Sequence, residues 1–252
     1  MLKRKITVCV VIFIIAISVC ACSKKASRVD NSTESVLEIS TTEVPTTETL
    51  TAEKDEDISI GDYITFGTYE QDNDTYNGKE AIEWIVLDIK DGKMLVISRC
   101  GLDFQRYNEE GTDNEWEVCT LRKWLNRTFF NSAFSEEEQN MIPTVVVPAH
   151  RNPTHNTYPG NSVEDKIFLL SIQEANMYFE YDEDRMCETT FYTYDICGDK
   201  YCQWWLRSQG NVGGRAAVVN TMGKIDEYGK NCDKRYGEEQ VVRPAMWINL
   251  NS

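Results

Sequence analysis

The sequence predicts an α+β domain with a mainly antiparallel sheet, two or three short helices and long loops. Strand-like apolar runs follow one another in groups joined by turns, instead of alternating singly with helices. Helical spacing with a capping signal is confined to residues 120–141 and 171–179. The chain has no internal repeat and no glycine-rich nucleotide-binding fingerprint. This order indicates antiparallel pairing, because parallel sheets need a helix or long crossover between strands.

The first strands are expected between residues 58 and 98. Isoleucines and a phenylalanine alternate with polar residues from Ile58 to Phe66, which is the period of a strand with one buried face. Residues 82–89 are apolar on both faces and predict a central strand. Asp91-Gly92 then predicts a tight hairpin turn into a strand over 94–98.

Three helices are expected. Apolar residues recur at helical spacing after Thr120, at Leu121, Trp124, Leu125 and Phe129. Two further starts have the spacing of a capping box, Ser135 with Glu138 and Ser171 with Glu174. These predict helices through Met141 and Phe179.

Further strands are expected over residues 144–147, 166–170, 202–208, 215–220, 225–228 and 243–250. Trp204 and Trp205 are neighbours in one of them, and successive strand side chains point to opposite faces. One indole is therefore expected in the core and the other outward or in a groove. Pro244 cannot donate a ladder hydrogen bond, so the last strand is expected at an edge or with a bulge.

The N-terminus has the pattern of an export signal. Three basic residues, Lys3 to Lys5, precede an apolar run from Ile6 to Val19. The following Val19-Cys20-Ala21-Cys22 resembles a bacterial lipoprotein box, which implies a diacylglyceryl thioether on Cys22. The alternative is an uncleaved membrane helix over residues 6–22, barely long enough to span. Both interpretations place the rest of the chain outside the cytoplasm.

The chain is therefore divided into a signal peptide (1–22), a linker (23–56) and a single domain (57–252). The linker is rich in Ser, Thr and Glu and has no aromatic residue. Such a composition cannot bury enough apolar surface to fold, so we expect a coil with a reach of roughly 30 Å.

The formal net charge of −15 bears on the choice of partner. Nucleic-acid binders need a basic surface to displace counterions, so nucleic acid is not expected as a partner. The simplest interpretation of the acidity is a solvated, self-repelling surface.

No catalytic set, metal site or cofactor site is expected. His150 and His155 lie five residues apart in a loop, which is not a zinc-binding spacing. Asp72, Asp74 and Glu83 match part of a calcium loop, but Asn77 replaces the required glycine and flanking helices are absent.

Six cysteines lie in the domain, and an even number in an exported chain permits three disulfides. They are Cys100, Cys119, Cys187, Cys197, Cys202 and Cys232. The sequence leaves the connectivity open; Cys197 and Cys202 are the nearest pair. The rival interpretation is a reactive thiol, although nothing in the sequence marks one cysteine as activated.

Several motifs resemble a large bacterial family of domains of unknown function, over about residues 57–250. They include Trp204-Trp205-Leu206-Arg207-Ser208 and Val242-Arg243-Pro244-Ala245-Met246-Trp247-Ile248. The chain departs from the family pattern at Glu70 and Gln209, where Pro is frequent. The last third is also similar to C-type-lectin-like and formylglycine-generating-enzyme-like domains. That similarity implies pairing of the first and last strands and ligand binding among the loops after Gly210 and Gly229.

These features favour a lipid-anchored binding module at the outer face of the cell membrane. Its ligand would be a glycan, a cell-wall fragment or a surface protein. Stacking on the ligand is expected from Trp204, Trp205 and Trp247, since aromatic faces bind sugars and cations. Arg207 and Arg243 are candidates for an anionic group or for internal ion pairs. The alternatives are an enzyme on the same scaffold, using a cysteine or a loop carboxylate, and a structural envelope protein.

Overall fold

The computed structural model describes residues 58–109, 114–232 and 239–250, and these belong to a compact unit that runs from Lys54 to Ser252. The signal peptide expected over 1–22, with Cys22, and the linker expected over 23–56 lie outside the described residues. The described part is α+β with mostly antiparallel strands, which confirms the predicted fold class. None of its helices is both long enough and apolar enough to span a membrane.

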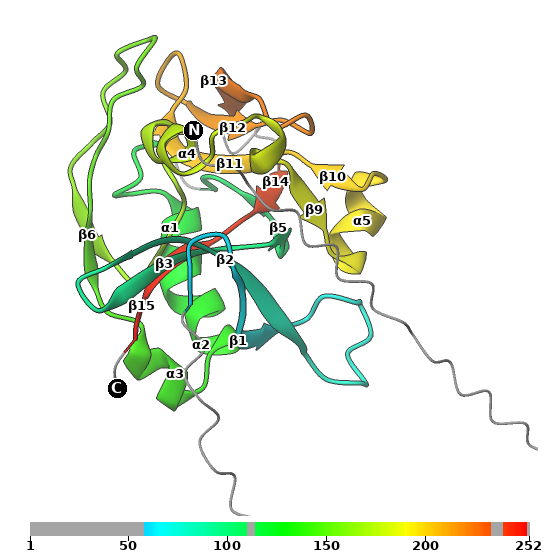
Figure 1. The fold of residues 1–252 in the computed structure, drawn as a ribbon. Coiled ribbons are helices and arrows are strands. Elements are labelled where there is room, and N and C mark those ends of the chain that lie inside the picture. Colours follow the sequence, from blue (N-terminus) through cyan, green and yellow to red (C-terminus); the bar gives the residue numbers. More distant parts are fainter. Residues whose placement is uncertain (1–57, 110–113, 233–238, 251–252) are drawn as a thin grey trace, which may run out of the picture. The chain divides into compact units, whose positions relative to one another are not determined.

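The first large sheet is fully antiparallel, and the last described strand of the chain lies inside it, between two earlier strands (Figure 1). Its strands, in spatial order, are β1 (Tyr63–Tyr69), β2 (Glu80–Lys90), β3 (Lys93–Ser98), β15 (Ala245–Asn249) and β8 (Ile167–Phe168). The hairpin between β2 and β3 turns at Asp91 and Gly92, which both have positive φ. This confirms the turn expected there, because a two-residue hairpin needs such backbone angles.

The second large sheet contains the Trp-Trp strand at its centre. Its order is β13 (Ile225–Asn231), β12 (Arg215–Val219), β11 (Trp204–Gln209), β14 (Glu239–Val242) and β5 (Asp103–Arg106). The strands β11 and β14 are parallel, and the other neighbours are antiparallel. Every residue of β11 is buried, so the strand is covered on both faces.

Two small sheets complete the strands of the described residues. One contains β10 (Tyr201–Cys202), β9 (Cys187–Thr189) and β4 (Cys100–Gly101), and the other pairs β6 (Val145–Val147) with β7 (Val163–Asp165). In Figure 1 the strands β9 and β10 lie beside α5.

The helices are short, and most of the α-helices begin at a side-chain cap. A continuous helical segment contains α1 (Thr120–Trp124), the π-helical turn η1 (Leu125–Phe129) and α2 (Phe130–Ala133). The others are α3 (Glu136–Met141), α4 (Ile172–Tyr178), the 3-10 turn η2 (Glu183–Arg185) and α5 (Phe191–Cys197). Both predicted capping boxes are present, at Ser135 and Ser171. The helix α5, capped by Thr190, has no counterpart among the expected elements.

Two expectations about the closing strands are wrong. The strand β15 pairs with β3 and β8, while β1 pairs only with β2, so the first and last strands do not meet. The expected edge position after Pro244 is also corrected. Pro244 lies between β14 and β15, at the point where the chain leaves one sheet for the other, and its carbonyl accepts the Ser98 N–H at 3.0 Å. A residue without an N–H fits this break in the ladder.

Candidate functional site

The two indoles expected to bind ligand are in the core. Trp204 and Trp205 are both 0% exposed. Each donates its indole N–H to a backbone carbonyl, Trp204 to Arg185 at 3.0 Å and Trp205 to Gln105 at 2.9 Å. The expectation that one of them faces outward is therefore wrong, because β11 lies at the centre of a sheet that is covered on both sides. As placed, neither ring can stack against a ligand.

Arg243 is also an interior residue, at 1% exposure. Its guanidinium donates to the carbonyls of Ser98, Arg185 and Arg99 and lies over the rings of Trp204 and Phe179. Burial lowers its pKa. The expected roles of anion binding and ion pairing are both corrected here. The positive charge of Arg243 is stabilised by carbonyl oxygens and ring faces and not by a carboxylate.

Arg207 forms the internal ion pair that was one of its two expected roles. Its guanidinium contacts both carboxylate oxygens of Glu174, with Nη2 to Oε1 at 2.8 Å, and donates to the carbonyls of Leu169 and Pro148. Burial raises the pKa of Glu174, but Arg207 and the Ser171 N–H outweigh that effect and the pKa is lowered overall. The pair fixes the start of α4 against β11.

The five predicted ligand residues do not form one surface. Trp204 and Arg243 are in contact in the interior, whereas Arg207 is committed to Glu174. Trp247 lies on β15, in the other large sheet, and is partly exposed, with the Lys90 ammonium 5.0 Å from its ring centroid. A ligand-stacking role for Trp247 alone stays a prediction.

A polar cleft of about 300 Å³ lies elsewhere, between the β1–β2 loop and the start of α5. Its lining consists of Gln71, Asp72, Glu80, Ala81, Glu83, Cys100, Thr190 and Phe191. The sequence prediction missed this site, because residues 71–79 are polar and turn-rich and the segment that forms α5 has no amphipathic period. The available signal was an apolar residue, Phe191, directly after a helix-capping threonine.

Hydrogen bonds between distant segments hold the two walls of the cleft together. The Gln71 carbonyl accepts the Tyr192 N–H at 2.9 Å, which joins the β1–β2 loop to α5. The Gln71 N–H donates to the Glu80 carboxylate at 2.6 Å, and its amide donates to the carbonyls of Glu80 and Ala81. Thr190 closes the capping box of α5 and leaves the Phe191 ring 64% exposed. The cleft therefore combines fixed polar groups with an open aromatic ring.

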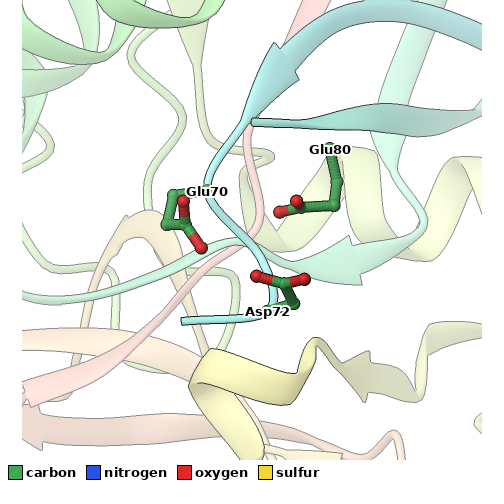
Figure 2. A group of neighbouring side chains, drawn as sticks. All are labelled: Glu70, Asp72 and Glu80. Atoms are coloured by element: carbon green, nitrogen blue, oxygen red, sulfur yellow. The ribbon is translucent and has the colours of Figure 1, made fainter. Parts of the chain in front are cut away.

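Three carboxylates converge at the loop end of the cleft (Figure 2). One oxygen from each of Glu70, Asp72 and Glu80 lies within 4.8 Å of the others. Burial and the charge of Glu80 raise the pKa of Glu70, whereas the Asp74 N–H and the Asn77 amide lower that of Asp72. Oxygen donors of this kind suit a hard cation such as Ca²⁺. Two of them are also engaged within the protein, since Asp72 and Glu80 accept backbone N–H groups.

The cysteines form one disulfide, between Cys197 and Cys202, among the described residues. The even count permits three, but Cys100, Cys119, Cys187 and Cys232 are free thiols. Burial raises the pKa of Cys100 and of Cys232, and raises that of Cys119 and Cys187 to about 12. An activated nucleophile has a lowered pKa instead. These free thiols therefore lack the electrostatic environment that the thiol-enzyme alternative requires.

Comparison with known proteins gives a family without an assigned activity. No curated protein and no solved structure matches the chain. The model of one family, described as a domain of unknown function (DUF6273), matches residues 91–250, which is more than half of the chain. The matched range contains β11, which carries the Trp-Trp motif, and the Arg-Pro pair between β14 and β15. The chain therefore belongs to the DUF6273 family of domains of unknown function.

Proposed function

We propose that this protein is a lipid-anchored binding module outside the cytoplasm that takes a carbohydrate ligand in the cleft beside Phe191. The observation that carries the proposal is the exposed Phe191 ring at the edge of a cleft lined by carboxylate, amide and hydroxyl groups. An aromatic face binds the apolar face of a sugar ring, and fixed polar groups bind its hydroxyls.

The charge of the cleft indicates which sugars it would take. Asp72, Glu80 and Glu83 line it; Glu83 is paired with Arg99, so Asp72 and Glu80 carry the negative charge, and the chain as a whole is acidic. These carboxylates would accept hydrogen bonds from neutral or amino sugars and repel acidic ones. A cell-wall glycan rich in amino sugars therefore fits this cleft better than a uronic-acid polymer.

The anchor rests on the sequence around Cys22. A lipid on this residue, followed by a polar linker, would hold the domain at the outer membrane–water boundary and within reach of the wall. A Cys22→Ala substitution should then release the protein from the membrane fraction. If the variant stays in the membrane fraction to the same extent as the unaltered protein, the lipid is not the anchor.

Binding is tested by titrating soluble cell-wall fragments and neutral and acidic oligosaccharides into the full-length protein in a nonionic detergent. Phe191→Ala should weaken binding of amino-sugar ligands about tenfold, the loss expected for one aromatic–sugar contact of about 1.4 kcal/mol. The matched control is Tyr194→Ala, because Tyr194 is an exposed aromatic residue on the same helix outside the cleft lining. Equal affinities for both variants, or no binding of any sugar, would exclude the cleft as a carbohydrate site. Absence of all binding would favour the structural envelope alternative.

A further inference from the structure

A second cavity, of about 310 Å³, has four cationic side chains among its eight lining residues. Arg122 and Lys123 come from α1, Arg127 from η1, and Lys166 from the residue between β7 and β8. Four cations around one cavity are unexpected for a chain with a net charge of −15. This cavity is lined by other residues than the carbohydrate cleft, and the inference does not depend on the proposed function.

The acids beside this cavity do not cancel its positive charge. Asp165 is buried and bound to Arg122, with Nε to Oδ1 at 2.7 Å, and it also accepts the Trp116 indole N–H at 2.9 Å. Glu164 binds the Arg122 guanidinium through its backbone carbonyl at 3.2 Å. The Arg122–Asp165 pair is therefore internally neutral, and Arg127 and Lys166 outnumber the remaining carboxylate of Glu164.

Lys166 is a partly buried cation without a carboxylate partner among the described residues. Its ammonium donates to the carbonyls of Ile142 at 2.6 Å and Gln139 at 3.2 Å, and it lies 5.1 Å from the Phe130 ring centroid. Burial lowers its pKa, which means that the protein does not fully replace the hydration of this charge. An anion bound in the cavity would compensate for the hydration that the Lys166 ammonium loses.

The Arg127 side chain forms no hydrogen bond, ion pair or ring contact with any residue that the structure describes, although its backbone carbonyl accepts the Phe130 N–H. Other arginines differ: Arg99 contacts Glu83 and Glu188, and Arg207 contacts Glu174. The Arg127 guanidinium, which lines this cavity, is thus available for a ligand. A guanidinium presents donors that match phosphate oxygens in a bidentate manner.

We propose that the cavity of Arg122, Lys123, Arg127 and Lys166 binds a phosphate group, with Arg127 and Lys166 as its direct contacts. Cations from two separate segments, the continuous helical segment of α1 and η1 and the residue between β7 and β8, suit a tetrahedral group that carries charge on several oxygens. The shared chemistry is a phosphomonoester or phosphodiester. Its source would be a soluble phosphate compound, a phosphate-containing polymer or a lipid headgroup.

The experiment is a calorimetric titration of the full-length protein, in a nonionic detergent and chloride buffer, with three soluble probes. Inorganic phosphate and glycerol phosphate represent the dianion, and glycerophosphoglycerol represents the diester of polymers and headgroups. We expect saturable binding of at least one probe that weakens as salt increases. A preference for the diester would indicate a polymer or headgroup, and a preference for the dianions a soluble phosphate compound.

Arg127→Gln should weaken binding of the preferred probe about tenfold, because one charge-assisted contact is lost. Folding should be unaffected, since the Arg127 side chain forms no hydrogen bond or ion pair with another described residue. The matched control is Lys224→Gln, which removes one exposed charge in the β12–β13 turn. Equal weakening by the two substitutions would show only a general charge effect and overturn the proposal. Failure of all three probes to bind would overturn it as well.

Discussion

The guanidinium carbon of Arg243 lies 5.2 Å from the ring centroid of Trp204, and both residues donate to the same backbone carbonyl, that of Arg185. The Trp-Trp motif and the Arg-Pro motif thus meet inside the protein. Arg185 is itself buried and donates to the carbonyls of Phe179 and Gly223. Gly223 has no room for a side chain, because an added Cβ would lie 1.6 Å from the Asp182 carbonyl oxygen. The two motifs therefore maintain a packed junction.

We predict that Arg243→Lys lowers the free energy of unfolding by about 2–3 kcal/mol. The substitution keeps the charge but loses the planar fork that reaches three carbonyls and two ring faces. Urea denaturation followed by circular dichroism measures the change. Arg106→Lys is the control, since Arg106 is partly exposed and pairs with Glu239 at the surface. Similar losses of unfolding free energy for both substitutions would contradict the claim that the buried contacts of Arg243 stabilise this junction.

The buried indoles give a second prediction. Trp205→Phe should cost about 1–3 kcal/mol of stability, because it leaves the Gln105 carbonyl without its indole donor and removes core volume. Trp247→Phe should cost less, since that ring is partly exposed on β15. Urea unfolding compares the two variants. A larger loss for Trp247→Phe would mean that β11 is not covered on both faces.

Local signals in the sequence were sufficient for several elements. The capping boxes at Ser135 and Ser171 and the Asp91-Gly92 turn involve residues within four positions of one another, so composition and spacing specify them. The order of elements also gave the fold class. In contrast, strand partners depend on residues far apart in the chain, as in the contact of β15 with β3 and β8.

The candidate site could not be predicted in the same way. Strand alternation predicted that one indole of Trp204-Trp205 faces outward, but β11 is covered on both faces by distant segments: Arg207 pairs with Glu174, and Ser208 accepts the Ile172 N–H at 3.0 Å. Both partners lie more than 30 residues away in the sequence. The cleft at Phe191 likewise forms only when the β1–β2 loop meets α5. Sites assembled by such long-range contacts leave little trace in local patterns.

Stability should depend on pH through His150. This side chain lies 3.1 Å from the Ser171 hydroxyl, and burial, followed by the charge of Arg207, lowers its pKa below the ordinary value near 6.5. Glu174 opposes this effect but does not overcome it. The folded state then binds fewer protons than the unfolded state. The stability that depends on neutral His150 is complete above about pH 6.5 and is lost as the pH falls through the lowered pKa.

We predict that His150→Gln flattens the rise in unfolding free energy between about pH 5 and about pH 7. Chemical denaturation at several pH values in this range measures the slope. His155→Gln serves as the control, because His155 is the other histidine of the chain and its ring packs against Tyr228. An unchanged slope in the His150 variant would show that another group titrates there.

The Cys197–Cys202 disulfide closes a short loop directly after α5. The disulfide reduces the number of conformations open to the unfolded chain. For a loop of this length, that loss of entropy should raise the free energy of unfolding by about 2 kcal/mol. The paired substitutions Cys197→Ser and Cys202→Ser should therefore lower the midpoint of urea unfolding. Because α5 forms one wall of the cleft, the same variant should also weaken the binding of any ligand beside Phe191.

The disulfide itself can be checked by alkylation of the unfolded, unreduced protein followed by peptide mass spectrometry. This measurement should find Cys197 and Cys202 linked and Cys119 and Cys187 modified as thiols. The control is Cys119→Ser, which removes a buried thiol far from α5 in the sequence and should leave ligand binding unchanged. If both variants lose binding equally, the effect comes from general destabilisation and the disulfide has no particular role in holding the cleft wall.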